Sequence, residues 1–477
     1  MREFTDKVLE YAQSLGADYA DVRVLEHQAE TVSVIKKNAG LAQEDTRGFG
    51  LRVIANGAWG FACSPLLDDQ SVQEVANKAV ALARASALCR KEPVVLSEEK
   101  PVVDSWCTPV KVDPFAVKTE HKVDMLMELD GLMRKHPKVG SSSSYIKSGR
   151  QNKVFANTEG SFVEQTITEV GASMSATAAD HRDHQTRSYP NGRNGDHATS
   201  GFEFIEDLKM ADHAERIAAE AGELLEAEAC PTLGATDLIL DGSCLALQIH
   251  ESVGHPMELD RALGWEKSMA GGTRLTPDLL GKVQYGSPVV NISADATIPR
   301  GLATFGYDDE GVPAQRAELV KAGTFCGYLN SRETAGLLGQ QSMGSVRSPS
   351  WNKLQLVRMT NVNLDPGDWR KDEIIKDTRD GIYMEGMGAV SIDDMRINFQ
   401  SSPELAYEVK DGSLGKMYRN PSYSGKSMAF WRSCDAVSHD DWRVWGLPSC
   451  GKGQPGQIVH VGHGASATRY RDIKVGV

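Results

Sequence analysis

The period of the apolar residues changes several times along this chain, and this limits the possible folds more than any other feature of the sequence. Residues 4–15 repeat apolar side chains at helical spacing, and Gly16 is placed to end a helix. Apolar and polar side chains then alternate, as in half-buried strands, over residues 20–24, 31–35, 48–54 and 59–62. Asn56-Gly57 separates the last two runs and is typical of a two-residue hairpin turn. Helical spacing returns over 70–90, so this part of the chain is predicted to be α+β.

The rest of the chain extends this α+β prediction and divides the molecule in two. Residues 137–200 are rich in Ser, Thr, Gly and Asn between strand-like runs, which predicts antiparallel sheet, and one long amphipathic helix is expected over 204–229. Glycine-rich and β-prone segments dominate after that helix. The chain has 477 residues, more than one hydrophobic core usually serves, so we expect two domains. These are a mixed α/β N-terminal domain over 1–230, which forms dimers or controls substrate access, and a β-rich C-terminal domain over 231–477.

Composition argues against several classes of protein. The 52 Lys and Arg against 65 Asp and Glu leave a net charge of −13, which repels nucleic-acid phosphates and anionic lipids. The 8 Cys are scattered singly, with no Cys-x-x-Cys pair, which suits a reducing compartment. The first residues carry charges where a secretory signal has its apolar region, and no stretch reaches the roughly 18 to 20 apolar residues of a membrane span. We therefore expect a cytoplasmic protein that binds neither nucleic acid nor membrane.

Residues 236–260 carry the clearest chemical signal. They predict a strand, an Asp-Gly turn and a helix that starts near Ser243 and contains His250-Glu251-Ser252-Val253-Gly254-His255. Two histidines with a glutamate directly after the first are typical of zinc hydrolases, in which neutral imidazoles bind the metal and the carboxylate acts on water. The spacing here is H-E-x-x-x-H.

That spacing needs a local distortion of the helix. In a regular α-helix, residues five apart differ by about 140° around the axis, so both imidazoles could not easily reach one ion. A π-bulge would return them to the same face, and such bulges are common at functional sites. Gly254 would tolerate the distortion, and Pro256 favours a helix end at His255. The competing interpretation is a chance pair of histidines on an ordinary helix.

A catalytic zinc usually has three protein ligands and water, so a third ligand must come from elsewhere. The spacing does not choose among nearby Glu258, Asp260 and Glu266 and distant Cys434, His439, Cys450, His460 and His463. Cys450 lies in a polar, glycine-rich stretch that we interpret as a loop able to approach a site closely.

Other clusters have simpler interpretations. His181-Arg182-Asp183-His184 is expected to be an exposed loop rather than a second metal site. Asp308-Asp309-Glu310 lacks the spacing of an EF-hand and is expected to be a solvated turn. A group of aromatic residues near Cys450 is expected to pack a core, with lining of a peptide channel as the alternative: Phe430, Trp431, Trp442 and Trp445.

Three motifs follow one another in the C-terminal half. They are the run from His250 to His255, Leu356-Val357-Arg358-Met359-Thr360-Asn361-Val362 followed by Asp365-Pro366-Gly367, and Ser449-Cys450-Gly451-Lys452-Gly453-Gln454. The N-terminal half adds the opening helix and the runs Gly-Ala-Asp-Tyr-Ala-Asp and Thr-Arg-Gly-Phe-Gly-Leu-Arg-Val. With these motifs, essentially the whole chain resembles the TldD/PmbA family of cytoplasmic peptidases, also called modulators of DNA gyrase, and within it the TldD branch.

The resemblance implies a zinc peptidase in which His250, His255 and Cys450 hold Zn²⁺ and Glu251 is the general base. It also implies unfolded or extended peptides as substrates, and a dimer formed either with a second copy or with a PmbA/TldE-like subunit that lacks the motif. Because this chain keeps every ligand, it should be the catalytic subunit. Two alternatives remain, a binding or scaffold protein with a structural zinc and a non-catalytic, gyrase modulator-like regulator.

Overall fold

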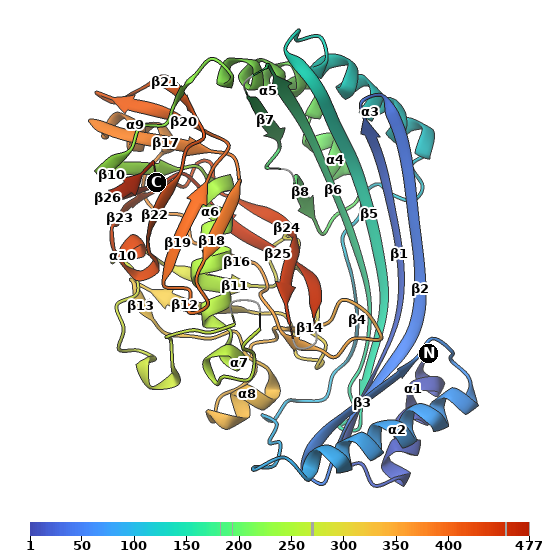
Figure 1. The fold of residues 1–477 in the computed structure, drawn as a ribbon. Coiled ribbons are helices and arrows are strands. Elements are labelled where there is room, and N and C mark those ends of the chain that lie inside the picture. The colour runs from blue at the N-terminus through green and yellow to red at the C-terminus, as the bar shows by residue number, and fades with distance from the viewer. Residues whose placement is uncertain (182, 193, 269–270, 454–455, 477) are drawn as a thin grey trace.

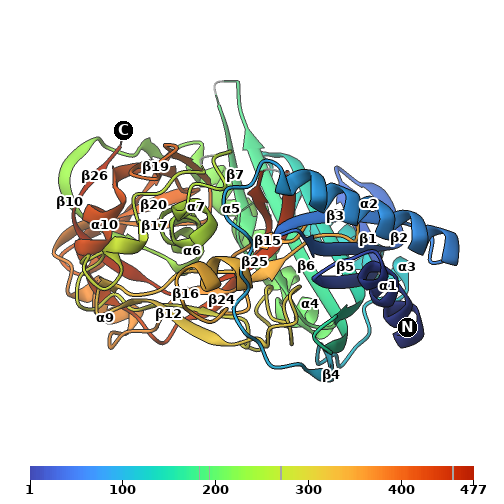
Figure 2. The same cartoon turned by 90° about the horizontal axis from the view of Figure 1, so that it is seen from below.

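The computed structural model describes residues 1–181, 183–192, 194–268, 271–453 and 456–476. It has a mixed α+β fold in two halves, which Figure 2 shows side by side. Within these ranges, no helix combines the length and the apolar character that crossing a membrane requires.

The N-terminal half is built on a sheet with the strand order β3-β2-β1-β5-β6-β4, and β7 and β8 add to β6. The strands are β1 (Tyr19–Ile35), β2 (Asn38–Ala55), β3 (Ala58–Ser64), β4 (Val103–Cys107), β5 (Val139–Asn157), β6 (Phe162–Ala179), β7 (His184–Tyr189) and β8 (Asp196–Ala198). Neighbours pair antiparallel, as predicted over 137–200, except that β4 is parallel to β6. The long strands curve, and the C-terminal half lies against their concave face (Figure 1).

Helices bury the two ends of this sheet. They are α1 (Arg2–Ser14), α2 (Asp69–Ala87), α3 (Thr119–Met133), α4 (Glu203–Asp207) and α5 (Met210–Leu224). Helices α1 and α2 pack an apolar cluster at one end, and α3, α4 and α5 pack another at the opposite end. The helices predicted over 4–15 and 70–90 are confirmed as α1 and α2. Asn56-Gly57 forms the predicted hairpin turn, with φ of 54° and 75°.

Two predictions for this half are wrong in their boundaries. The runs at 20–24 and 31–35 belong to one continuous strand, β1. The single helix expected over 204–229 is broken at Lys209, whose φ is +47°, and α5 ends at Leu224. Both pieces pack into the same apolar cluster, so apolar residues continue at helical spacing across the break. The spacing of apolar residues therefore does not indicate that the helix is broken.

The C-terminal half is a second, mixed sheet with smaller sheets and a central helix. The main sheet has the order β18-β19-β22-β26-β10-β17-β20-β21-β9, with β23 on β26. Its strands are β9 (Glu228–Ala229), β10 (Leu233–Leu240), β17 (Asp380–Glu385), β18 (Ala389–Ile392), β19 (Asn398–Ser402), β20 (Leu405–Lys410), β21 (Ser413–Arg419), β22 (Tyr423–Lys426), β23 (Cys434–Val437) and β26 (Thr468–Val475).

Smaller elements complete this half. A further sheet has the order β13-β12-β11-β16, and β14 pairs with β15 and β24 with β25. These strands are β11 (Ile292–Asp295), β12 (Arg316–Lys321), β13 (Thr324–Phe325), β14 (Val346–Arg347), β15 (Leu356–Val357), β16 (Val362–Leu364), β24 (Arg443–Lys452) and β25 (Gln457–Ala465). The helices are α6 (Gly242–Ile249), α7 (Leu259–Ala262), α8 (Arg332–Leu337), α9 (Lys371–Lys376) and α10 (Ser427–Arg432), with a short 3₁₀ turn at Pro277–Leu279.

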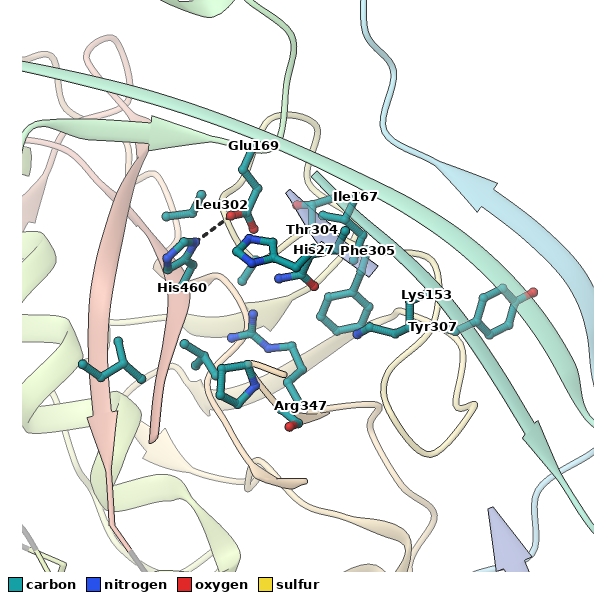
Figure 3. Close-up of a pocket in the computed structure, with 16 residues that line it drawn as sticks. His27, Lys153, Ile167, Glu169, Leu302, Thr304, Phe305, Tyr307, Arg347 and His460 are labelled. Atoms are coloured by element: carbon teal, nitrogen blue, oxygen red, sulfur yellow. Dashed lines mark hydrogen bonds and ion pairs between the residues drawn. The ribbon is translucent and has the colours of Figure 1, made fainter. Parts of the chain in front are cut away.

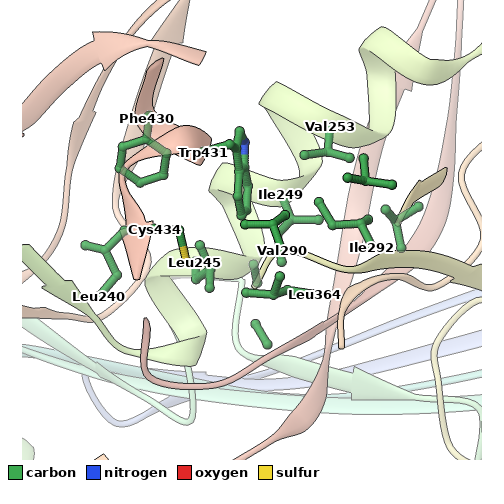
Figure 4. Close-up of a cluster of buried hydrophobic side chains, with 14 of the residues drawn as sticks. Leu240, Leu245, Ile249, Val253, Val290, Ile292, Leu364, Phe430, Trp431 and Cys434 are labelled. Atoms are coloured by element: carbon green, nitrogen blue, oxygen red, sulfur yellow. The ribbon is translucent and has the colours of Figure 1, made fainter. Parts of the chain in front are cut away.

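Helix α6 lies at the centre of the C-terminal core. Figure 4 shows Leu245, Ile249 and Val253 projecting from this helical segment toward Trp431 and Val290 on other elements. Trp431 and Phe430 are buried there, as predicted, whereas Trp442 and Trp445 are half-buried. A helix that is apolar on nearly all sides must be enclosed, and this enclosure fixes the position of the segment that follows it.

Buried ion pairs join the two halves, and they overturn the prediction of a solvated turn at Asp308-Asp309-Glu310. All three acidic residues are buried. Asp309 pairs with Arg23 of β1 at 3.1 Å and with Lys153 of β5 at 2.6 Å, and Glu310 pairs with Arg52 of β2 at 3.1 Å. The prediction fails because the neutralising cations lie on strands that are far away in the sequence, so the residues around Asp308-Asp309-Glu310 do not indicate them.

Candidate metal centre

Helix α6 begins and ends in ways that the local sequence explains. Asp241 caps it by accepting a hydrogen bond from the Cys244 amide at 3.0 Å. At His250 the helix widens into a π-helix over His250–Gly254, followed by a 3₁₀ turn over His255–Met257. The π-bulge predicted from the H-E-x-x-x-H spacing is therefore present.

Gly254 has a different role from the one predicted. Its φ is −56°, which any residue can adopt. A Cβ atom at this position would lie 2.1 Å from the Met359 sulfur, so any larger residue would displace the buried Met359 side chain that packs on the helical backbone.

The π-helix brings His250 and His255 to one side, where they meet Cys450. The three possible ligand atoms all lie within 4.8 Å of one another, and each of these side chains is buried. His255 Nε2 lies 3.8 Å from the Cys450 sulfur. Within the described residues, this is the one group of His, Cys and acidic side chains that has the geometry to hold a metal ion.

Both histidines are held by partners that leave one ring nitrogen directed to the centre. His463 Nδ1 lies 3.0 Å from the Val362 carbonyl oxygen and must donate to it, because a carbonyl only accepts. His463 Nε2 can therefore accept a hydrogen bond from His250 Nδ1, which lies 2.9 Å away. His255 Nδ1 lies 2.9 Å from Glu258. Both rings therefore keep an unprotonated Nε2, the form that a metal ion needs. The residues present fit a zinc ion.

Cys450 is not in a loop, as its glycine-rich neighbours suggested. It is fully buried on strand β24, just after a register shift between Leu447 and Cys450 that places the bulge at Pro448 and Ser449. Burial alone would raise the pKa of its thiol, but the Arg358 guanidinium and His255 lower that pKa to about 7. Arg358 Nη2 lies 3.1 Å from the sulfur, and no described carboxylate pairs with this guanidinium. The arrangement favours the thiolate, the form in which cysteine binds metals.

Glu251 lies beside the three residues and is the most exposed of the group, with 22% of its side chain accessible. Its carboxylate forms an ion pair with Arg396 Nη1, which also donates to the Glu251 carbonyl at 3.2 Å. Burial would raise the pKa of Glu251, but His250, His255 and Arg396 lower it to about 2, so the carboxylate is ionised.

The other residues considered as metal ligands have different partners or lie elsewhere. Glu258 and His463 hold the two histidines, and Asp260 pairs with Lys452 at 2.7 Å. His460 lies 2.6 Å from Glu169 of β6. Three others are not part of the group whose ligand atoms meet at the centre: Glu266, Cys434 and His439. Arg358 and Arg396, which contact it, were missed because a lone arginine carries no spacing signal.

A cavity of about 190 Å³ separates the centre from the N-terminal sheet. Figure 3 shows Glu169 and His27 on the sheet side and His460 and Arg347 opposite them. Ile458 is the exposed residue of β25 and His460 is half-buried, whereas Val461 and His463 on its other face are buried. The β24–β25 hairpin is thus the wall between this cavity and the candidate metal site.

The described residues of the His181-Arg182-Asp183-His184 run lie away from this centre. Asp183 pairs with Arg419 at 2.6 Å, and His184 begins β7; Arg182 lies outside the described residues.

Comparison with known proteins gives consistent matches over the whole chain. Descriptions of PmbA/TldA metallopeptidases match residues 20–83 as domain 1, 112–227 as the central domain and 233–476 as the C-terminal domain. A metalloprotease of Methanocaldococcus jannaschii is 31% identical over 460 residues, which cover 95% of this chain and 96% of the relative.

Two further proteins extend the comparison. A zinc metalloprotease TldD homolog of Saccharolobus solfataricus is 22% identical, with 98% of this chain and 99% of the relative covered. The crystal structure of a Thermotoga maritima protein, proposed to modulate a DNA gyrase, superposes with a TM-score of 0.77 at 18% identity and covers 100% of both chains.

Proposed function

The chain belongs to the PmbA/TldD metallopeptidase family, and from this premise we propose that it is the zinc-dependent catalytic subunit of a peptidase that hydrolyses extended or unfolded peptides. The observation that carries the proposal is the meeting of His250, His255 and Cys450 beside the ionised carboxylate of Glu251. These three residues would hold the zinc ion through Nε2, Nε2 and Sγ.

A bound zinc ion supplies Lewis acidity, which polarises the scissile carbonyl and makes water a better nucleophile. Glu251 then takes the proton from the attacking water and later delivers it to the leaving amine. Arg396 holds this carboxylate in place and keeps it ionised between turnovers. Glu258 and His463 fix the orientation of the two imidazoles. A thiolate ligand donates more charge than a carboxylate, so turnover of small peptides should be slow.

The free edge of β18 supports the preference for extended chains. This strand is the last in its sheet, and within the described residues only β19 pairs with it. The segment directly after β18 carries Arg396, the partner of Glu251. A peptide that added to this edge as a further strand would therefore run toward the catalytic carboxylate. A folded protein keeps most of its strands paired and so offers few segments of this kind.

The proposal includes a dimer, formed with a second copy or with a PmbA/TldE-like subunit. The N-terminal half holds none of the three ligands, but it presents exposed apolar side chains where β1 meets β2: Ile35 is 53% and Leu41 54% exposed. A partner at this surface would bury these two side chains, and pairing of two subunits would limit access to narrow chains.

The test combines metal analysis with digestion of one substrate protein before and after denaturation. Zinc-loaded enzyme should cleave the denatured form, a chelator should stop cleavage, and added zinc should restore it. Glu251→Gln should retain zinc and lose at least about 10²-fold in activity, because the amide preserves shape but cannot accept a proton. Equal cleavage of native and denatured substrate, or full activity of Glu251→Gln, would reject the proposal.

A further inference from the structure

A second cavity, of about 420 Å³, lies against the π-helical turn on the side of Glu251. Three of its lining residues touch that turn or continue it. Arg396 pairs with Glu251, Pro256 follows His255 directly, and the Tyr285 hydroxyl donates to the Ser252 carbonyl. The cavity is thus built on the same turn that carries the ligands and the base.

The wall of this cavity is apolar. Six of its lining residues are large and apolar: Leu275, Leu279, Val283, Met395, Ile397 and Met428. Met395 is 42% exposed at the surface, whereas Leu275 is 4% exposed at the inner end. Two of the lining cations have other partners, since Arg396 binds Glu251 and Arg432 Nε donates to the Gln284 carbonyl at 2.7 Å. The other two, Arg274 and Lys426, are exposed to solvent. An occupant of the inner part would therefore meet mainly hydrocarbon, including the methylene stem of Arg396.

We propose that this cavity is the subsite for one large apolar side chain of the peptide, at a position next to the bond that is cleaved. The inference rests on the proposed function and deepens it, because it names the class of residue that the site selects. The volume falls in the range of ligand pockets, roughly 300–1,000 Å³, and exceeds what a glycine or alanine could fill. Continuity with Arg396 and Pro256 places the occupant beside the catalytic carboxylate rather than at a remote surface.

Selectivity should follow from the apolar area that the side chain buries. Filling a hydrophobic pocket better by a methylene group changes kcat/KM by about 10- to 200-fold. Leucine or phenylalanine at the selected position should therefore be preferred over glycine by at least about tenfold. Glutamate should gain less than leucine, because the apolar wall offers its carboxylate no hydrogen-bond donor and the two other lining cations, Arg274 and Lys426, are exposed to solvent.

The test uses fluorogenic peptides of one sequence that carry Gly, Leu, Phe or Glu at a single position, scanned on both sides of the cleaved bond. Ala429→Phe fills the cavity from α10, where Ala429 is exposed and lines it. Val283→Phe fills it from a separate segment, in case the first variant folds poorly. Ala85→Phe adds the same side chain to an exposed position of α2 and is the matched control.

Wild type and Ala85→Phe should prefer Leu or Phe at one position, and both filled variants should lose that preference while they still cleave the Gly peptide. If wild type shows no apolar preference, or if the preference survives in both filled variants, the subsite is refuted and the proposed function stands. If zinc-loaded wild type cleaves no peptide, the proposed function fails. In that case the subsite is tested by measuring the affinities of labelled Gly and Leu peptides for Glu251→Gln. Equal affinities for the two peptides would refute the subsite. Loss of self-association in Ala429→Phe would assign the cavity to a second copy instead.

Discussion

Asp309→Asn should destabilise the protein strongly, because Asp309 lies between two buried cations that come from the other half of the molecule. Arg23 approaches it at 3.1 Å and Lys153 at 2.6 Å, and the exposed fractions of these side chains are 2% and 7%. The amide keeps the shape of the carboxylate and can still accept from the Ser348 amide, which lies 2.7 Å from the native side chain. The substitution therefore removes the charge and one of the two accepting oxygens, because the NH2 group of the amide would face the Lys153 ammonium while the remaining oxygen accepts from Ser348.

The expected loss is about 3–5 kcal/mol in the free energy of unfolding, the usual cost of leaving a buried charge without its partner. Burial would raise the pKa of Asp309, but Lys153 and Arg23 hold it below its ordinary value. The carboxylate therefore contributes stability above its unfolded pKa, and this contribution is lost as the pH falls through the folded pKa. The difference between wild type and Asp309→Asn should be full at pH 7 and shrink at strongly acidic pH.

Urea unfolding followed by tryptophan fluorescence measures this difference. Asp372→Asn is the matched control, because it removes an aspartate from an exposed pair with Lys376 and should leave the midpoint unchanged. Lys153→Met combined with Asp309→Asn should recover part of the loss, since one uncompensated cation disappears. A midpoint for Asp309→Asn no lower than that of the Asp372→Asn control would refute the reasoning.

Three further predictions concern the metal and the assembly. Cys450→Ala should lower zinc content sharply, as measured by elemental analysis, and normal occupancy would move the third ligand elsewhere. Glu258→Gln should weaken zinc binding by about 10- to 100-fold in competition with a chelator, because His255 loses the charge that orients it, and unchanged affinity would deny Glu258 this role. Light scattering at micromolar concentration should give a mass of two subunits. A mass near the 51.9 kDa of one chain, with peptidase activity intact, would contradict the dimer.

Elements set by local chemistry could be predicted from the sequence. Helical spacing located α1 and α2, and Asn56-Gly57 located a turn whose positive φ values those residues tolerate. The π-helix at His250–Gly254 could also be predicted, because the angle between residues five apart follows from helix geometry and Pro256 lies directly after His255. In each case the deciding interaction lies within one turn of the chain.

Features that depend on distant residues could not be predicted. The glycine-rich neighbours of Cys450 suggested a loop, but pairing with β25 makes this segment a buried strand. The sequence around Asp309 predicts a solvated residue, because its partners Arg23 and Lys153 lie far away in the sequence. Arg396 reaches Glu251 across 145 residues of sequence, and nothing in its own neighbourhood marks it as a partner of the catalytic carboxylate. A sequence pattern reports the period of an element but not which charge another element supplies.

The origin of the three ligands has a consequence for the growing chain. His250 and His255 belong to one helical turn, but Cys450 comes from a hairpin 195 residues after His255. During synthesis the first two ligands and Glu251 emerge early, without a thiolate to complete the centre. A nascent or truncated chain therefore has the proposed base and two of the three proposed ligands at a stage when its own unfolded segments are the nearest available substrate. With this proposed ligand set, the centre is complete only when almost the whole polypeptide has been made and folded, an order that would limit self-digestion.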